Sequence, residues 1–301
     1  MIKSFSLLAL FILYTVTTCA QRWKSERHSL VLDAGISHFM GDLGGGTKDA
    51  AHFFGVRDLD FSSTRPVVSL KYRFRVLEPL SVKAGVTWAM LSADDAASGS
   101  EGRKLRNLSF TSQIYQFSLH GEYYFVKEKA NPRYSFSSLH SIRNISAYAF
   151  TGISVFYFNP QAELDGTKYD LQPLGTEGQG IGDNPPLYNQ IGIGWPVGLG
   201  AKYRLNNKIS IGLEISNTFT NSDYLDDAHG SYYDNAAISA TYGPIAAELA
   251  DRHIDASGNP QAPYPSGTLH RGGNSYNDAF IFTVVTVTYL LKRDNTGLPK
   301  F

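Results

Sequence analysis

The sequence predicts an all-β protein, an eight-stranded antiparallel up-and-down transmembrane β-barrel with long extracellular loops. Three observations favour this fold class. Apolar and polar residues alternate with a period of two along eight runs of the chain. Most of the runs are longer than the strands of soluble proteins, which average about five or six residues. The connections between them are mostly long at one end and short at the other, as in outer-membrane barrels.

The first twenty residues indicate a secretion signal. Lys3 supplies a positive charge, residues 5–16 are an apolar run, and residues 18–20 form a small-residue cleavage site. The apolar run is too short to cross about 30 Å of hydrocarbon as a helix. The chain is therefore predicted to consist of a signal peptide, residues 1–20, and an outer-membrane barrel domain, residues 21–301.

Cys19 is the only cysteine in the sequence. An alternative is that Cys19 is the lipidated residue of a lipoprotein signal, although Thr18 is larger than that site usually tolerates. Cleavage after Ala20 leaves a mature chain without thiols, which excludes disulfides and cysteine-based metal sites. The formal net charge of the full chain is +0, so there is no basic excess to neutralise the phosphates of a nucleic acid.

The first clear hairpin spans residues 67–90. In VVSLKYRFRV, residues 67–76, apolar side chains occupy alternate positions and serine, lysine or arginine lies between them. LSVKAGVTWAM, residues 80–90, repeats the alternation, and only residues 77–79 separate the two runs. Two alternating runs joined by so short a connection predict a β-hairpin.

The two faces of this hairpin predict which side faces lipid. A charge on the lipid face near the middle of the bilayer costs about 2 to 4 kcal/mol. We therefore expect Leu70, Tyr72 and Phe74 to face lipid. The opposite face points into the lumen, where basic side chains meet two glutamates in an interior ion network that leaves no open pore: Lys71, Arg73, Arg75 and Lys83 with Glu122 and Glu214.

Six further runs complete the set of eight strands. One of them, residues 146–158, is apolar on both sides, so its facing is not predicted. The six runs are residues 29–37, 114–126, 146–158, 196–204, 208–219 and 278–291.

The connections predict the orientation of the barrel. With the N-terminus in the periplasm, the short connections 77–79 and 205–207 are periplasmic turns and the long connections are extracellular. The connection 127–145 is an exception, because it is long and basic yet falls on the periplasmic side. The long extracellular connections are residues 38–64, 91–113, 159–195 and 220–277.

A soluble eight-stranded barrel of the lipocalin kind is the structural alternative. Its apolar face would point inward, and alternation by itself does not distinguish the two folds. The export signal, the strand length and aromatic residues near the strand ends favour the membrane, where aromatic girdles mark both interfaces. These aromatic residues are Tyr123, Tyr124, Phe125, Tyr157, Phe158, Phe280 and Phe282.

Several segments together resemble one known family. They are ISHFMGDLGGG, RNLSFTSQIYQFSLHGEYYF, YAFTGISVFYFNPQAELDGTKYDLQPLGTEGQG, GLGAKYRLNNKISIGLEIS and TFTNSDYLDDAHGSYYD, in this order. This pattern is similar to the PorG-type outer-membrane β-barrel family of the type IX secretion system of the Bacteroidota. The pairing of LQPLGTEGQG with DYLDD is its most specific part. Asn221 and Ser222 depart from the family pattern as extra residues.

The resemblance implies a function. A PorG-like chain would be a non-enzymatic outer-membrane component of the secretion machine, associated with the periplasmic ring of the PorK lipoprotein and PorN. It implies no cofactor and no small-molecule substrate. The stretch AISATYGPIAAELADRHIDASGNPQAPYPSGTLHRGGN has no interpretation within the family.

The most polar stretch is TNSDYLDDAHGSYYD, at the start of the 220–277 connection. Its carboxylates miss the spacing of a calcium loop, and no metal or catalytic site is predicted. We expect Tyr224, Asp226 and Asp227 to have a structural role, in which Asp226 or Asp227 accepts hydrogen bonds from the loop backbone. The alternative is an outer-membrane enzyme or small-ligand barrel that uses this connection, with His229 as a candidate base.

The periplasmic side is the predicted docking surface. A hairpin needs only a few residues, so the length of the 127–145 connection suggests a second task. Together with the N-terminal segment QRWKSERH it offers basic and aromatic side chains to an acidic partner surface. The candidate docking residues are Trp23, Lys127, Lys129, Arg133, Tyr134 and Arg143.

Overall fold

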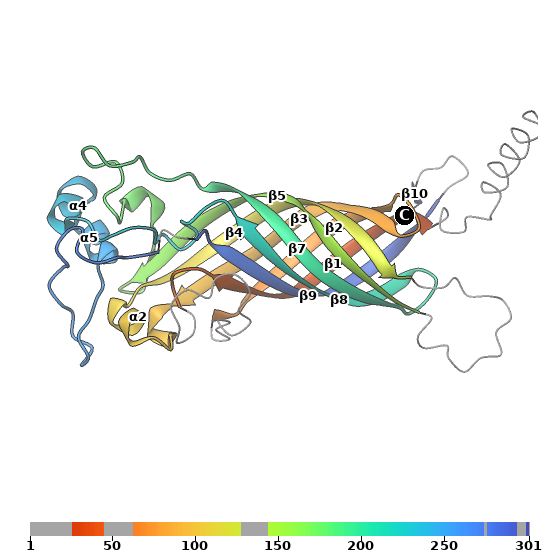
Figure 1. Cartoon of the computed structure of the whole chain (residues 1–301), viewed down its shortest axis with the longest axis horizontal. Helices are drawn as coiled ribbons and strands as arrows, with labels where there is room; N and C mark the ends of the chain where they lie inside the picture. Colours follow the sequence, from red (N-terminus) through yellow and green to blue (C-terminus); the bar gives the residue numbers. More distant parts are fainter. Residues whose placement is uncertain (1–25, 45–62, 128–143, 274–275, 294–298, 301) are drawn as a thin grey trace, which may run out of the picture.

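The computed structural model describes residues 26–44, 63–127, 144–273, 276–293 and 299–300. Across these ranges, eight antiparallel strands close into a barrel, because β1 (His28–Met40) pairs with both β2 (Arg65–Arg75) and β9 (Ala279–Arg293). The predicted fold class is confirmed (Figure 1). The other barrel strands follow in chain order: β3 (Leu80–Asp94), β4 (Ser109–Val126), β5 (Ile145–Leu164), β7 (Ile191–Arg204) and β8 (Ile209–Thr220).

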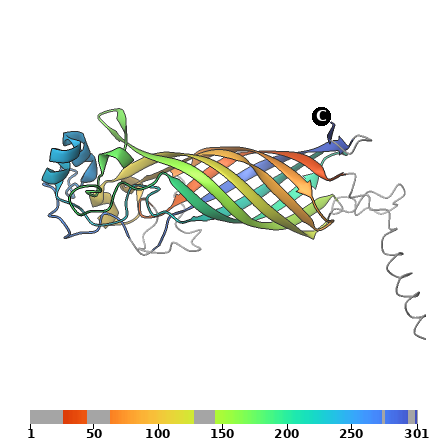
Figure 2. The ribbon, with the colours of Figure 1, turned by 90° about the horizontal axis from the view of Figure 1, so that it is seen from above.

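The two ends of the barrel differ in what they carry (Figures 1 and 2). We call the end with the connections 76–79 and 205–208 the turn end, and the opposite end the loop end. The short strand β10 (Pro299–Lys300) pairs with β9 at the turn end. No helix among the described residues is long and apolar enough to cross a membrane. The loop end carries η4 (Asp95–Ala97), α2 (Glu101–Arg106), β6 (Thr167–Asp170), η5 (Gln172–Leu174), α4 (Asn235–Tyr242) and α5 (Pro244–Ala250).

Most of the strands extend further toward the loop end than the runs predicted from sequence, and β4, β5 and β7 (from Ile191 rather than residue 196) extend the most. β4 begins at Ser109 rather than residue 114, and β5 continues to Leu164 rather than residue 158. The outward-facing extra residues of β4 and β5 are polar, but they still pair with one another, as in Gln113 opposite Asn159. Backbone pairing continues where the lipid-facing pattern ends, so the barrel wall rises beyond the apolar belt.

The facing of the side chains agrees with the predicted parity. Leu70, Phe117 and Leu199 point outward with exposed fractions of 53%, 56% and 62%, whereas Lys71 and Arg73 are buried. An apolar exterior around a polar interior is the pattern of an outer-membrane barrel. The lipocalin-like alternative is wrong, because its apolar face would line the interior.

The predicted aromatic girdle is only partly correct. Tyr123, Phe125 and Tyr157 do point outward. Successive residues of a strand point to opposite faces, so the neighbours of these residues face the lumen. The facing of β5, which the sequence left open, follows the same rule: Phe150 and Phe156 are buried inside, and Ile153 and Val155 are exposed. Four of the seven expected girdle residues lie inside the barrel: Tyr124, Phe158, Phe280 and Phe282.

Candidate functional site

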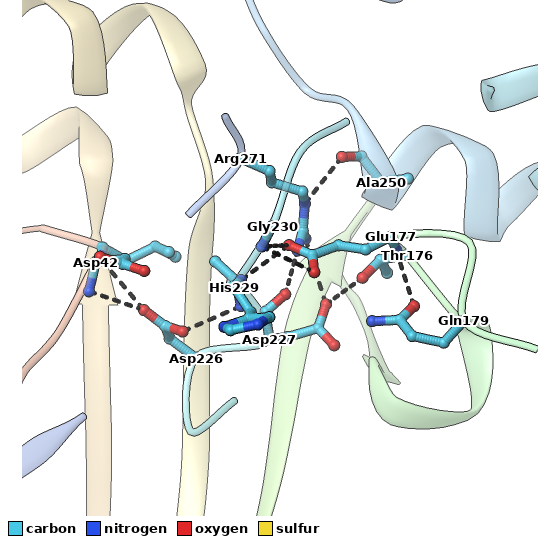
Figure 3. Close-up of polar contacts among 12 residues, drawn as sticks. Asp42, Thr176, Glu177, Gln179, Asp226, Asp227, His229, Gly230, Ala250 and Arg271 are labelled. Atoms are coloured by element: carbon cyan, nitrogen blue, oxygen red, sulfur yellow. Dashed lines mark hydrogen bonds and ion pairs between the residues drawn. The ribbon is translucent and has the colours of Figure 1, made fainter. Parts of the chain in front are cut away.

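Segments that are far apart in the sequence meet at the loop end and form a polar cluster (Figure 3). We call this cluster the cap. It joins residues 42–44, which follow β1, residues 176–179, which follow η5, and two parts of the β8–β9 connection, residues 223–230 and 271–273. Three of these parts come from segments that carry the family resemblance, including LQPLGTEGQG and DYLDD.

Asp226 attaches the β8–β9 connection to the residues that follow β1. Its Oδ2 accepts hydrogen bonds from the backbone N–H groups of Asp42 and Leu43, both at 3.2 Å. Its Oδ1 accepts from the N–H group of Ala228 at 3.1 Å. The side chain is buried, and this burial, followed by the nearby charge of Asp42, raises the pKa of Asp226 well above its usual range.

Asp227 binds partners on three other segments. Its Oδ1 accepts from the hydroxyl of Tyr188 at 2.8 Å, and its Oδ2 accepts from Thr176 at 2.5 Å. Arg271 lies 3.3 Å from the same Oδ2 and also donates to the backbone carbonyl of Asp227. Burial raises the pKa of Asp227 to about 6, although Arg271 acts to lower it.

Glu177 holds the following turn of the same connection. Its carboxylate accepts from the backbone N–H groups of His229 at 2.9 Å and Gly230 at 3.1 Å. Its Oε1 also lies 3.4 Å from Nη1 of Arg271. Arg271 donates in addition to the carbonyl of Ala250 at 3.1 Å, so one buried guanidinium connects this turn to the end of α5.

Tyr224 belongs to a stack of aromatic rings above the lumen. Its ring lies parallel to that of Tyr188, with a centroid separation of 4.5 Å. Tyr188 in turn stacks on Phe158 of β5, with ring centroids 6.2 Å apart. The stack therefore links the cap to the barrel wall through apolar contact, while the hydroxyl of Tyr188 remains bonded to Asp227.

The candidate base, His229, pairs with a carboxylate. Its Nδ1 lies 2.5 Å from Oδ2 of Asp223. Burial, together with the charges of Asp42 and Glu177, raises the pKa of Asp223 to about 7 against the opposing effect of His229. Asp226 is poorly placed to act on a substrate, because its side chain is buried and its two oxygens accept hydrogen bonds from three backbone N–H groups.

The interior ion network is present, with one residue more than predicted and one in a different role. Lys83 lies 3.0 Å from Glu122 and 2.7 Å from Glu214, and Nε of Arg73 lies 2.7 Å from Glu122. Lys71 pairs with Asp33 of β1 at 2.7 Å, and Asp33 is not among the residues predicted from sequence. The guanidinium of Arg75 lies over the ring of Tyr124. All the ion-paired side chains named here are buried, so they close the lumen at their level. A cavity with an empty volume of about 390 Å³, open solvent included, lies beside them and is lined in part by Lys71 and Glu214.

The predicted docking residues lie mostly outside the described residues. This applies to Trp23, Lys129, Arg133, Tyr134 and Arg143. Lys127 is described, and its Nζ lies 3.3 Å from the carboxylate of Glu78 in the β2–β3 turn. Both side chains are exposed, so this ion pair contributes little to stability.

Several residues of the cap are not among those predicted from sequence. Thr176 and Glu177 lie within the quoted stretch LQPLGTEGQG, so the resemblance pointed to their segment but not to their roles. Arg271 lies in the stretch that had no interpretation, and no spacing in the sequence connects it to Asp227. Among the described residues, no group of three or more metal-binding side chains is arranged to hold an ion.

Comparison with known proteins gives one family and a set of similar folds. The family described as "Domain of unknown function (DUF6089)" matches residues 5–249. No curated protein matches the chain. Similar solved structures include Neisserial surface protein A, with a TM-score of 0.39, 8% identity, and coverage of 87% of this chain and 96% of that one.

Two further barrels are similar at the same level. The outer membrane protein OprG from Pseudomonas aeruginosa has a TM-score of 0.38 at 9% identity, covering 88% of this chain and 97% of that one. The attachment invasion locus protein Ail of Yersinia pestis, in complex with the heparin analogue sucrose octasulfate, has a TM-score of 0.35 at 8% identity, covering 87% and 98%.

Proposed function

We propose that this chain, which belongs to the DUF6089 family, is a non-enzymatic outer-membrane component of the type IX secretion system. In this proposal the turn end faces the periplasm and docks the ring of PorK and PorN. Residues 1–20 are the signal peptide that directs export. The identity of the machine rests on the resemblance of the quoted segments to PorG-type barrels.

The observation that carries a non-enzymatic role is the closure of the lumen by buried ion pairs. Buried ion pairs join β2, β3, β4 and β8 across the interior, which supports a barrel that acts through its ends rather than as a pore. At the loop end, the most polar residues are engaged with one another and with the backbone. The turn end has the one long connection that a hairpin does not require, between β4 and β5.

The test shortens that connection. Replacing residues 129–143 with Asn-Gly should leave the barrel folded, because a two-residue turn of this kind suits antiparallel strands. Heat-modifiable migration in gels reports the folded barrel. Co-purification of PorK from detergent-solubilised outer membranes and secretion of type IX cargo should both be lost.

The matched control shortens a connection at the opposite end. Replacing residues 163–168, the outer part of the β5–β6 hairpin, with Asn-Gly shortens the loop end, keeps Ala162 opposite Tyr169 and leaves the turn end unchanged. This variant should retain PorK and secretion. If PorK still co-purifies after replacement of residues 129–143, that connection is not the docking surface.

A further inference from the structure

The outer surface of the barrel wall becomes polar where β4 and β5 approach the loop end (Figure 1). Tyr115 and Tyr157 lie opposite each other on these strands, and both side chains are exposed on the outside. Side chains two residues further along a strand return to the same side, so amides follow the tyrosines on the outer surface. We call this surface the amide face, and its residues are Gln113, Asn159, Gln161, Asp170 and Gln190.

The two tyrosines indicate where the wall leaves the hydrocarbon. Tyrosine is enriched at membrane interfaces, where its ring meets lipid and its hydroxyl meets the polar headgroups. Phe125, also exposed, lies ten residues after Tyr115 on β4. Ten residues of antiparallel strand rise about 34 Å, which is about 24 Å of height at a tilt of about 45°. The apolar band of an outer-membrane barrel is about 25 Å tall, so the amide face lies at the depth of the lipid headgroups.

Hydrogen bonds hold the amide face in one arrangement. Oδ1 of Asp170 accepts from the amide of Asn159 at 2.9 Å and from the amide of Gln161 at 2.6 Å. The amide of Gln190 in turn donates to Oδ1 of Asn159 at 2.8 Å. On β4, Oε1 of Gln113 accepts from the hydroxyl of Tyr115 at 3.0 Å. A surface that is already ordered loses less conformational freedom when a ligand binds.

The amide face still offers both donors and acceptors to a ligand. Nε2 of Gln113, Oε1 of Gln161 and Oδ2 of Asp170 have no hydrogen-bond partner within the part of the chain that the structure describes. A carboxamide nitrogen donates, carboxamide and carboxylate oxygens accept, and a hydroxyl group does both. The neighbouring hydroxyl groups of a sugar therefore match this surface.

The charge of the surface favours a neutral ligand. The charged residues of the β5–β6 hairpin are Glu163, Asp165, Lys168 and Asp170, so negative charge exceeds positive charge. A phosphate or carboxylate group would be repelled by this excess. A sugar hydroxyl would instead donate a charge-assisted hydrogen bond to Asp170.

We propose that the amide face binds the neutral sugar headgroup of a glycolipid whose acyl chains lie against the apolar belt. The lipid-facing surface continues directly from the tyrosines, through exposed Phe117 of β4 and Val155 of β5, which lie opposite each other. That this lipid belongs to the outer leaflet rests on the orientation in the proposed function, whereas the binding itself does not. The site lies on the outside of the barrel, apart from the cap and from the predicted docking surface.

Native mass spectrometry of the full chain, in a detergent without a sugar headgroup, tests the proposal. The probe is a dioleoyl glycerolipid with a neutral digalactosyl headgroup, and the reference is dioleoyl phosphatidylglycerol at the same concentration. Wild type should retain the glycolipid at least about threefold more than the reference, because several hydrogen bonds to the sugar add together. Gln113→Ala combined with Gln161→Ala should bring this ratio to about one.

The matched control removes two exposed amides outside the amide face, Asn207→Ala at the turn end with Gln261→Ala after α5, and should keep the wild-type ratio. Heat-modifiable migration reports whether each barrel is folded, and Gln113→Ala alone should already lower the ratio. Asp170→Lys replaces an acceptor with a cation and should increase retention of phosphatidylglycerol.

Three results would overturn the proposal. The first is equal retention of the two lipids by wild type, and the second is an unchanged ratio in the folded Gln113/Gln161 variant. The third is preferential retention of phosphatidylglycerol by wild type, which would indicate recognition of a phosphate rather than a sugar.

The glycolipid site and the proposed function fail in different ways. If wild type shows no preference for the glycolipid but PorK still co-purifies, the amide face is not a sugar site and the docking proposal stands. If the preference is present and depends on Gln113 and Gln161, while PorK does not co-purify with wild type, the glycolipid site stands and the ring assignment fails.

Discussion

Single buried residues hold the cap together, and Arg271 is the most connected of those described above. Its guanidinium contacts Glu177, the side chain and backbone of Asp227, and the carbonyl of Ala250. A buried arginine requires such partners, because removing the charge from water costs several kcal/mol. Burial acts to lower the pKa of Arg271, but Asp227 and Glu177 raise it overall, so the guanidinium remains charged.

The pKa of Asp223 predicts how cap stability depends on pH. Burial raises this pKa to about 7, above the value of about 3.9 for an aspartate in an unfolded chain. The folded cap therefore favours the protonated carboxyl. The contribution to stability is complete below pH of about 4 and is lost as the pH rises through about 7. The ionised group would lie near Asp42 and Glu177, with His229 as its opposing partner.

Limited proteolysis of the β8–β9 connection measures this effect. The ratio of the cleavage rates of wild type and Asp223→Asn at each pH cancels the pH dependence of the protease. This ratio should rise between about pH 5 and about pH 8, because only wild type ionises. Asp183→Asn, which removes an exposed carboxylate at the same end, should give a ratio that does not change with pH. A flat ratio for Asp223→Asn would contradict the prediction.

The strands β5 and β7 pack closely, because large side chains of β5 lie against glycines of β7. The inward positions of β7 include glycines, and aromatic rings of β5 occupy the space that side chains would fill. A Cβ at each of three glycines would lie 2.4 Å from a ring carbon: Gly192 from Phe156, Gly198 from Phe150, and Gly200 from Tyr148. The IGIG and VGLG stretches of β7 are therefore the counterpart of the aromatic run in β5.

Gly198→Ala should destabilise the barrel. The added methyl group would meet Phe150 and lie 2.6 Å from the backbone carbonyl oxygen of Ile215, which cannot move without disturbing β8. Overpacking of this kind costs about 1–3 kcal/mol. The urea midpoint for loss of the fast-migrating folded band in gels should fall.

The matched control is Gly121→Ala on β4. The nearest atom to its added Cβ is a backbone oxygen at 3.9 Å, so the methyl group has room. This variant should unfold at the urea concentration of wild type. If Gly198→Ala and Gly121→Ala have the same urea midpoint, the packing of aromatic rings against the glycines of β7 does not contribute to the stability of the barrel.

For the whole molecule, the ion network joins strands from around the barrel. Arg73 comes from β2, Lys83 from β3, Glu122 from β4 and Glu214 from β8. Tyr148 of β5 donates a hydrogen bond to Glu214 at 2.5 Å. In the closed barrel these groups lie at one level of the lumen. There the two glutamates neutralise the buried positive charges of Arg73 and Lys83.

Glu214→Ala should lower the free energy of unfolding by about 3–5 kcal/mol, because it leaves Lys83 and Arg73 with a single carboxylate between them. The urea dependence of the folded band measures this loss. Glu163→Ala removes an exposed glutamate of β5 at the loop end and should change stability little. A Glu214→Ala barrel as stable as wild type would mean that water, not Glu214, solvates the two cations.

The barrel can be predicted from the amino-acid sequence. Alternation with a period of two predicts strands and the facing of Leu70 and Lys71, since both follow from the geometry of a single strand. It also placed Lys83 and Glu214 in one lumen. The outward-facing residues of β4 and β5 become polar where lipid contact stops, which is why the apolar pattern does not predict the loop-end extensions of these two strands.

Which distant segments meet cannot be predicted in this way, because it depends on how the barrel closes. Pairing of β1 with β9 brings the residues after Met40 beside the β8–β9 connection, so Asp226 reaches Leu43, and Arg271 reaches Glu177 and Asp227. Closure likewise brings residues of β1, β9 and the β7–β8 turn around one cavity at the turn end. Such contacts depend on the register of closure rather than on local spacing, and an alternating pattern carries no record of that register between distant strands.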